Sequence, residues 1–143
     1  STPPAHADSA LEPLVIETAG GRHTVMVEVA ETDQQKAMGL MFRHSVPPGT
    51  GMLFPYRVEQ EITMWMHNTY VSLDMIFLRQ DGRVHRIARG TVPMSREIVA
   101  SEGPAAAVLE VAAGEADRLG IRPGNIVYFR SFGNQLTGGA TTK

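Results

Sequence analysis

The most specific run of this chain is Met64-Trp65-Met66-His67-Asn68-Thr69-Tyr70-Val71-Ser72-Leu73-Asp74-Met75-Ile76-Phe77-Leu78. Its second half predicts a strand at 73–79 that is apolar on both faces, which is typical of a central strand. Its first half predicts a strand at 62–67 and a turn at 68–72. The turn signal at 81–82 then predicts a hairpin into a strand at 83–89.

The residues before this stretch predict a hairpin and a short helix. β-branched runs at 14–16 and 24–29 flank a pair of glycines, which is typical of two strands joined by a turn. Thr32 and Gln35 fit a capping box, in which each side chain satisfies a free amide at a helix start. We therefore expect a helix over 33–41.

The remaining segments are mostly short. After the first helix we expect a strand at 52–54 ended by Pro55, a surface loop with a short strand inside it at 91–105, a strand at 107–111, a helix at 114–120 and a closing strand at 126–129. Many short strands with only two brief helices predict a mainly β fold, either an antiparallel β-sandwich or a partly closed, jelly-roll-like barrel.

The length of 143 residues favours a single domain. We expect a flexible lead-in at 1–12, one β-rich domain at 13–131 and a flexible tail at 132–143. The start Ser-Thr-Pro-Pro-Ala-His resembles that of a trimmed protein, so we expect that a signal or anchor segment has been removed.

Composition excludes several classes of function. With 43% hydrophobic and 20% charged residues, the chain is of the ordinary globular class. The net charge of −2 and the presence of only two lysines leave no basic stripe for nucleic acid. No apolar run reaches the ~18 residues that would predict membrane insertion. The lack of cysteine excludes disulfides and thiol catalysis.

Several motifs occur along the chain in the same order as in a known protein family. These are Gly39-Leu40-Met41-Phe42-Arg43, Gly51-Met52-Leu53-Phe54, the central stretch, and Val108-Leu109-Glu110 running to Gly114 and Gly120-Ile121. Over roughly residues 14–130 the chain resembles the DUF192 family, also called UPF0127. The resemblance implies a β-rich fold, no established activity, and a place in the cell envelope, periplasmic after removal of a signal segment. His67 departs from the family's frequent Lys or Arg.

The chain lacks the standard catalytic signatures, and this favours a non-enzymatic binding or accessory domain with a small polar cleft. The candidate ligand-binding residues are Arg43, Trp65, His67, Asn68, Thr69 and Asp74. The expected partner is an unknown small ligand or protein segment. No catalytic residue, metal or cofactor is assigned. Other carboxylates, at Glu59, Glu61, Glu97, Glu102 and Glu110, are expected on solvated faces.

Two alternatives stay open. One is a hydrolase or transferase that uses Asp74 and His67 as acid and base. The other is a periplasmic copper-handling protein that uses Met64, Met66 and His67, because thioethers and imidazole suit copper. In an extended strand, however, Met64 and Met66 share one face while His67 points to the other.

The sequence also predicts the environments of Trp65 and Asp74. We expect Trp65 to be buried, since apolar residues flank it. Asp74 lies in the most apolar strand, so its carboxylate needs at least two partners. The expected partners are Arg89 across the hairpin, or else Arg43 or the amides of 68–72.

Overall fold

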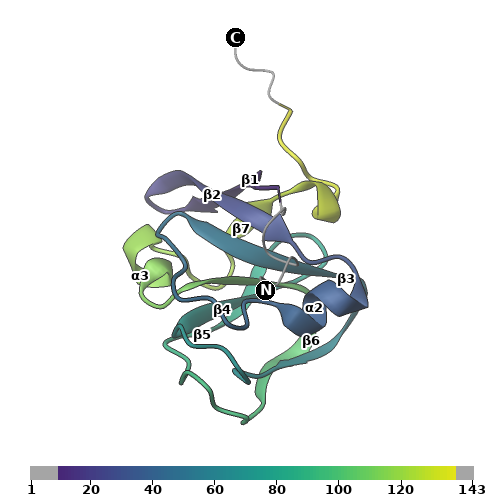
Figure 1. Cartoon of the computed structure of the whole chain (residues 1–143). Helices are drawn as coiled ribbons and strands as arrows, with labels where there is room; N and C mark the ends of the chain where they lie inside the picture. Colours follow the sequence, from purple (N-terminus) through teal and green to yellow (C-terminus); the bar gives the residue numbers. More distant parts are fainter. Residues whose placement is uncertain (1–9, 138–143) are drawn as a thin grey trace.

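The computed structural model describes residues 10–137. One sheet of seven strands, in the order β5-β4-β6-β3-β2-β1-β7, curls around the molecule (Figure 1). The elements are β1 (Glu12–Thr18), β2 (Gly21–Val29), α2 (Asp33–Met38), β3 (Thr50–Met64), β4 (Leu73–Leu78), β5 (Val84–Ala88), β6 (Val99–Ala112), α3 (Glu115–Leu119), β7 (Ile126–Tyr128) and the 3-10 helix η1 (Arg130–Phe132). The β2–β3 pair is parallel and the other pairs are antiparallel.

The two ends of the sheet approach one another. Arg83, just before β5, forms a β-bridge with Ile126 of β7. The Val84 amide donates to the Asn125 carbonyl at 2.8 Å, and the Val127 amide donates to the Gly82 carbonyl at 2.8 Å. The fold is therefore a partly closed barrel with two short helices, which confirms the predicted fold class.

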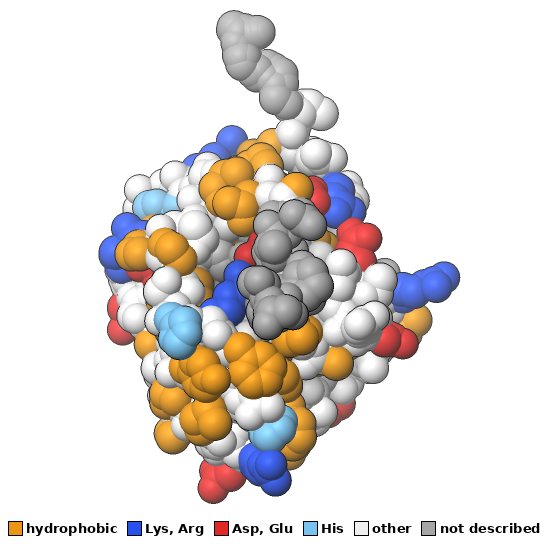
Figure 2. Space-filling model, viewed as in Figure 1, with side chains coloured by type: hydrophobic (Ala, Val, Ile, Leu, Met, Phe, Trp, Pro, Cys, Tyr) orange, Lys and Arg blue, Asp and Glu red, His pale blue; other side chains and the backbone are white. Residues whose placement is uncertain are grey.

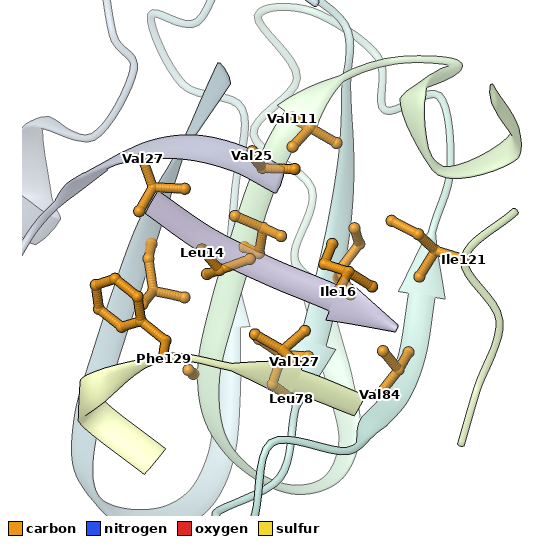
Figure 3. Packing of buried hydrophobic residues seen from close by; sticks show 14 of the residues in the cluster. Leu14, Ile16, Val25, Val27, Leu78, Val84, Val111, Ile121, Val127 and Phe129 are labelled. Atoms are coloured by element: carbon orange, nitrogen blue, oxygen red, sulfur yellow. The ribbon is translucent and has the colours of Figure 1, made fainter. Parts of the chain in front are cut away.

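The concave side of the sheet holds the larger apolar core. Leu14 and Ile16 of β1 point inward toward Val127 and Leu78 (Figure 3). Every strand contributes residues to this core, because alternate residues of a strand face opposite sides of a sheet.

A second apolar core lies on the opposite face of the middle strands. Its members include Met52, Phe54, Met75, Phe77 and Val108. Residues of the connecting segments, among them Leu40, Val46 and Met66, cover it. β4 is therefore buried along its whole length, as expected of a central strand.

Two predicted strand boundaries are wrong. β3 does not end at Pro55 but continues to Met64, with a register shift between Pro55 and Gln60. β2 pairs with β3 only as far as Leu53, so at Pro55 the strand β3 has β6 as its one neighbour. Proline has no amide hydrogen to donate, and it is tolerated at such an edge position. β6 begins at Val99, inside the segment expected to be mainly a loop, because its first half pairs with the far end of β3.

The helix signals are confirmed, although the first helix is shorter than expected. The capping box of Thr32 and Gln35 is present, and Gly39 ends α2 after Met38. α3 runs between Gly114 and Gly120 as predicted. The helices in the described part of the chain are all too short and too polar to cross a membrane. Most of the predicted lead-in and tail, at 1–9 and 138–143, lies outside the described residues.

Candidate functional site

A cavity of about 240 Å³ lies between α2, the segment that follows it, and the middle of the sheet. Its walls combine methionine and aromatic side chains with a few polar groups. The lining residues are Lys36, Ala37, Met38, Gly39, Leu40, Met41, Phe54, Tyr56, Thr63, Met64, Trp65, His67, Thr69, Leu73 and Glu110.

Glu110 is the acidic residue among those that line this cavity. On β6 it lies opposite Met52 of β3 and Met75 of β4, both members of the second core. By the alternation of a strand, Val108 shares its face, and Val108 is also in that core. Glu110 is only 4% exposed. The carboxyl group thus occupies a position in an otherwise apolar row.

The Glu110 side chain makes no hydrogen bond or ion pair within the described residues. Burial raises the pKa of its carboxyl from 4.5 to about 8, so the group is mainly protonated at neutral pH. Burial also raises the pKa of Tyr56, and the charge of Glu110 raises it further. These two side chains therefore interact electrostatically across the cavity.

Trp65 stands at the rim of the cavity and is 45% exposed, so the prediction of a buried tryptophan is wrong. β3 ends at Met64, and beyond it the chain turns so that Met66 enters the second core instead. The Trp65 ring packs against the His67 ring with centroids 4.8 Å apart. This aromatic pair forms part of the cavity wall.

Local hydrogen bonds hold the segment after Trp65. The Asn68 side-chain amide donates to His67 Nε2 at 3.2 Å, and the Thr69 hydroxyl donates to the His67 carbonyl at 3.0 Å. The Phe42 amide donates to the Asn68 carbonyl at 2.9 Å, which ties this segment to the loop after α2. Asn68 itself has a left-handed φ of 53°, which asparagine adopts more readily than most residues. The position of His67 at the cavity is therefore fixed by its neighbours.

Asp74 lies on the opposite face of the sheet from Glu110. Its carboxylate accepts backbone amides of Gly90, Gly114 and Ala116, each at 3.0 Å. The expectation of at least two partners is confirmed, but the named partners are wrong. Ile76 does face Ile87 as predicted, yet Arg89 turns away to Asp117 at 3.1 Å. Asp74 caps α3, whose own N-cap residue has no side chain to do so.

Only half of the predicted ligand-binding residues meet at the cavity. Trp65, His67 and Thr69 line it, whereas Arg43, Asn68 and Asp74 are not among its lining residues. Arg43 forms an ion pair with Glu28, with a 2.8 Å contact from Nη2 to Oε1.

Sequence reasoning assigned Glu110 to a solvated face, and the structure shows that assignment to be wrong. The signal that could have found it is a lone carboxylate in the apolar run Ala105-Ala106-Ala107-Val108-Leu109-Glu110-Val111-Ala112. Lys36, Tyr56 and Thr63 also line the cavity. They were not predicted as site residues because no motif in their own segments indicates a role in binding.

The chain is similar to known proteins over nearly the whole of this fold. A family model described as "Uncharacterized ACR" and named DUF192 matches residues 15–129. The chain belongs to the DUF192 family. No curated protein matches it.

Two solved structures resemble this DUF192 domain closely. One, from Sinorhizobium meliloti 1021, is described as a candidate transcription regulator; it is 40% identical, with a TM-score of 0.83, over 86% of this chain and 96% of that one. The other, from Novosphingobium aromaticivorans DSM 12444, is a protein of unknown function; it is 36% identical, with a TM-score of 0.81, over 90% of this chain and 99% of that one.

The copper ligands predicted for this DUF192 domain do not converge. Met64 and His67 line the cavity, but Met66 is 1% exposed in the second core, and its sulfur accepts the Thr91 hydroxyl at 3.2 Å. No group of three or more His, Cys, Asp or Glu side chains among residues 10–137 could hold a metal ion. Met38 and Met41 join Met64 in the cavity wall instead.

Exposed apolar side chains lie in the loops near the cavity. Phe42 and Tyr70 pack edge to face with ring centroids 6.2 Å apart, and the His44 ring lies 5.6 Å from that of Tyr70. Hydrophobic and histidine side chains gather on the lower part of the face drawn in Figure 2. Phe42 is 42% and Tyr70 44% exposed, values close to that of Trp65.

Proposed function

We propose that this DUF192 domain is a non-enzymatic binding or accessory domain, and that it holds a small organic molecule in the cavity beside Trp65. The observation that carries the proposal is Glu110, a carboxyl group buried at this cavity without a partner in the described chain. A buried polar group without a partner costs stability, so its presence favours a role in binding. Concave, largely apolar sites with a few polar groups are typical of small-molecule sites.

The size of the cavity supports a small ligand. An engineered cavity of about 150 Å³ holds benzene, so about 240 Å³ has room for a molecule of roughly ten non-hydrogen atoms. Tyr56, Thr63 and His67 place polar groups in the same wall as Glu110. Apolar contact and a small number of directed hydrogen bonds would therefore both contribute to binding.

The acid–base alternative has less support. Its proposed carboxylate, Asp74, is 1% exposed and already accepts three backbone amides on the face away from the cavity. His67 lies on the cavity side of the sheet. A general acid and base must both reach the same substrate, and these two side chains face different regions.

A second candidate function is copper handling, because the thioethers of Met38, Met41 and Met64 line one cavity together with His67. Thioether and imidazole ligands suit copper. Titration with Cu(I) would test this candidate. Tight stoichiometric binding that is lost in Met64→Leu but kept in Met66→Leu would favour it, since Met66 lies in the core.

We place the domain in the cell envelope as part of the same proposal, and the support for this location is the family resemblance, which implies an envelope protein. Fractionation of cells expressing the full-length gene product tests this location. The description of the Sinorhizobium relative points to transcription regulation instead. The net charge of −2 gives little support to a phosphate-binding surface on this chain.

The fluorescence of Trp65 offers a direct test of binding. It is the single tryptophan of the chain and lies at the rim of the cavity. A library of small fragments should contain compounds that change its emission. The same compounds should shift NMR signals of residues 36–41, 54–56, 63–69 and 110. If no fragment changes either signal, the proposal is wrong.

A further inference from the structure

The feature that specifies a ligand is the unpartnered carboxyl of Glu110. Its flanking positions on β3 and β4 are Met52 and Met75, neither of which can donate a hydrogen bond to it. No ion pair reaches it from within residues 10–137. A carboxyl group in this environment lacks a counter-ion that a ligand could supply.

Three other titratable side chains line the cavity. α2 contributes Lys36, β3 contributes Tyr56, and the segment after β3 contributes His67, whereas β4 contributes none. The Lys36 ammonium donates to the Glu31 carbonyl at 2.8 Å rather than to Glu110. Among the residues that line the cavity, Glu110 is therefore the one that can provide a negative charge to a ligand.

The aromatic walls favour positive charge. Lys36 Nζ lies over the Tyr56 ring, 5.1 Å from its centroid, so an ammonium already stands at this ring. Phe54 and Trp65 contribute two further aromatic rings. Aromatic faces attract cations, and the attraction is stronger where water is excluded.

We infer that the ligand is a small organic cation, a primary ammonium or guanidinium group on an apolar body, with Glu110 as its counter-ion. This inference rests on the proposed binding function. The cationic head pairs with the carboxylate, and the apolar body contacts the methionine and aromatic side chains. A charge-assisted hydrogen bond is roughly twice as strong as a neutral one, which makes charge the main discriminator.

Binding of such a cation is coupled to a proton. Because burial raises the pKa of Glu110 to about 8, the empty site is mainly protonated at neutral pH. A bound cation favours the ionised carboxylate, so binding releases close to one proton from Glu110. Affinity should therefore rise with pH up to about pH 8 and then level off.

The test uses three probes of nearly equal shape: 2-phenylethylammonium, the neutral 2-phenylethanol and the anionic phenylacetate. Binding is followed by Trp65 fluorescence and by calorimetry at neutral pH in buffers of different ionisation enthalpy, which reports the protons released. The ammonium should bind about tenfold more tightly than the alcohol, equivalent to about 1.4 kcal/mol. Phenylacetate should bind weakest.

Two variants complete the experiment. Glu110→Gln should keep the fold, abolish proton release and bring the ammonium and alcohol affinities together. Glu97→Gln makes the same substitution at an exposed loop residue and should change neither quantity.

The outcomes separate the two hypotheses. If the alcohol or phenylacetate binds at least as tightly as the ammonium, or if wild-type binding releases no proton, the inference of a cation is wrong while the binding function stands. If none of these probes and none of the screened fragments binds at the cavity, both are wrong.

Discussion

Two buried carboxyl groups lie on opposite faces of the central sheet and behave differently. Asp74 receives three backbone amides, whereas Glu110 receives no hydrogen bond from the described residues. The amides that solvate Asp74 come from distant parts of the chain, 16 to 42 residues away. A carboxylate with such partners is structural, and one without them is available to a ligand.

The titration of Glu110 should make the stability of the protein depend on pH. An unfolded carboxyl loses its proton near 4.5, whereas the folded one keeps it until about 8. Between these values the native state binds more protons than the unfolded state, so stability falls as pH rises. The contribution of Glu110 to the free energy of unfolding is fully present below the unfolded pKa of 4.5, and it is lost as the pH rises through about 8.

Urea unfolding between about pH 5 and pH 8 measures this slope, which for one group is at most about 1.4 kcal/mol per pH unit. We expect Glu110→Gln to remove this component and to raise stability at the alkaline end. Parallel curves for the variant and the wild type would show that Glu110 does not titrate in this way.

Trp65→Ala should have little effect on stability because the side chain is 45% exposed. We expect a loss of about 1 kcal/mol or less. Phe54→Ala is the matched control, since Phe54 is 1% exposed and should lose about 3–5 kcal/mol. Chemical denaturation of both variants measures the difference. Equal losses would mean that Trp65 is part of the core.

Both helices are short, and each depends on hydrogen bonds at its N-terminus. α2 has the capping box of Thr32 and Gln35, with Oγ1 of Thr32 accepting the Gln35 amide at 3.0 Å. α3 has Gly114 as its N-cap and takes its capping carboxylate from Asp74 on β4. Helices of five or six residues are not stable alone, so these bonds and the underlying core hold them in place.

Asp74→Asn should loosen α3 from the sheet. The amide group of asparagine would meet backbone donors of Gly90, Gly114 or Ala116, leaving at least one of them without an acceptor. We expect a loss of about 2–3 kcal/mol and faster hydrogen exchange in α3. Asp117→Asn, which breaks an exposed ion pair with Arg89, should cost less than about 1 kcal/mol. Full stability of Asp74→Asn would contradict the capping role.

Thr32→Ala should weaken α2 and, with it, one wall of the cavity. Loss of the cap costs about 1 kcal/mol. Residues 36–38 of this helix line the cavity, so ligand affinity should fall as the helix frays. Thr32→Ser keeps the hydroxyl and should restore both properties. Hydrogen exchange of the α2 amides provides the measurement, and unchanged exchange in the alanine variant would exclude this dependence.

Closure of the barrel joins distant parts of the chain: the Val84 amide bonds to the Asn125 carbonyl, and the Val127 amide bonds to the Gly82 carbonyl. Gly82 is at the centre of this closure: its φ is +91°, and a Cβ there would clash with the Val127 carbonyl and contact Asn134 Nδ2. The position therefore requires glycine both for backbone conformation and for space.

Gly82→Ala should open the junction between β5 and β7. Gly124→Ala is the matched control because its φ is +94° and a Cβ there would meet no atom within 4 Å beyond its chain neighbours. The control should lose about 1 kcal/mol from backbone strain alone. Gly82→Ala should lose more and should expose the amides of Val84 and Val127 to exchange. Equal effects of the two substitutions would mean that the junction contributes little stability.

The local features of this protein could be predicted from its amino-acid sequence alone. A run that is apolar on both faces identified β4, turn residues identified the hairpin after it, and capping residues identified both helices. These signals depend on neighbouring residues, which is why they can be read along the chain. The DUF192 motifs were also recognisable in order along the sequence.

Tertiary structure decided the extents of β3 and β6, the exposure of Trp65 and the different environments of Asp74 and Glu110. Each depends on a partner far along the chain: β6 supports β3 beyond Pro55, α3 supplies amides to Asp74, and α2 closes the cavity near Glu110. A sequence shows that a carboxyl group lies in an apolar strand, but the fold determines whether a hydrogen-bond donor reaches it.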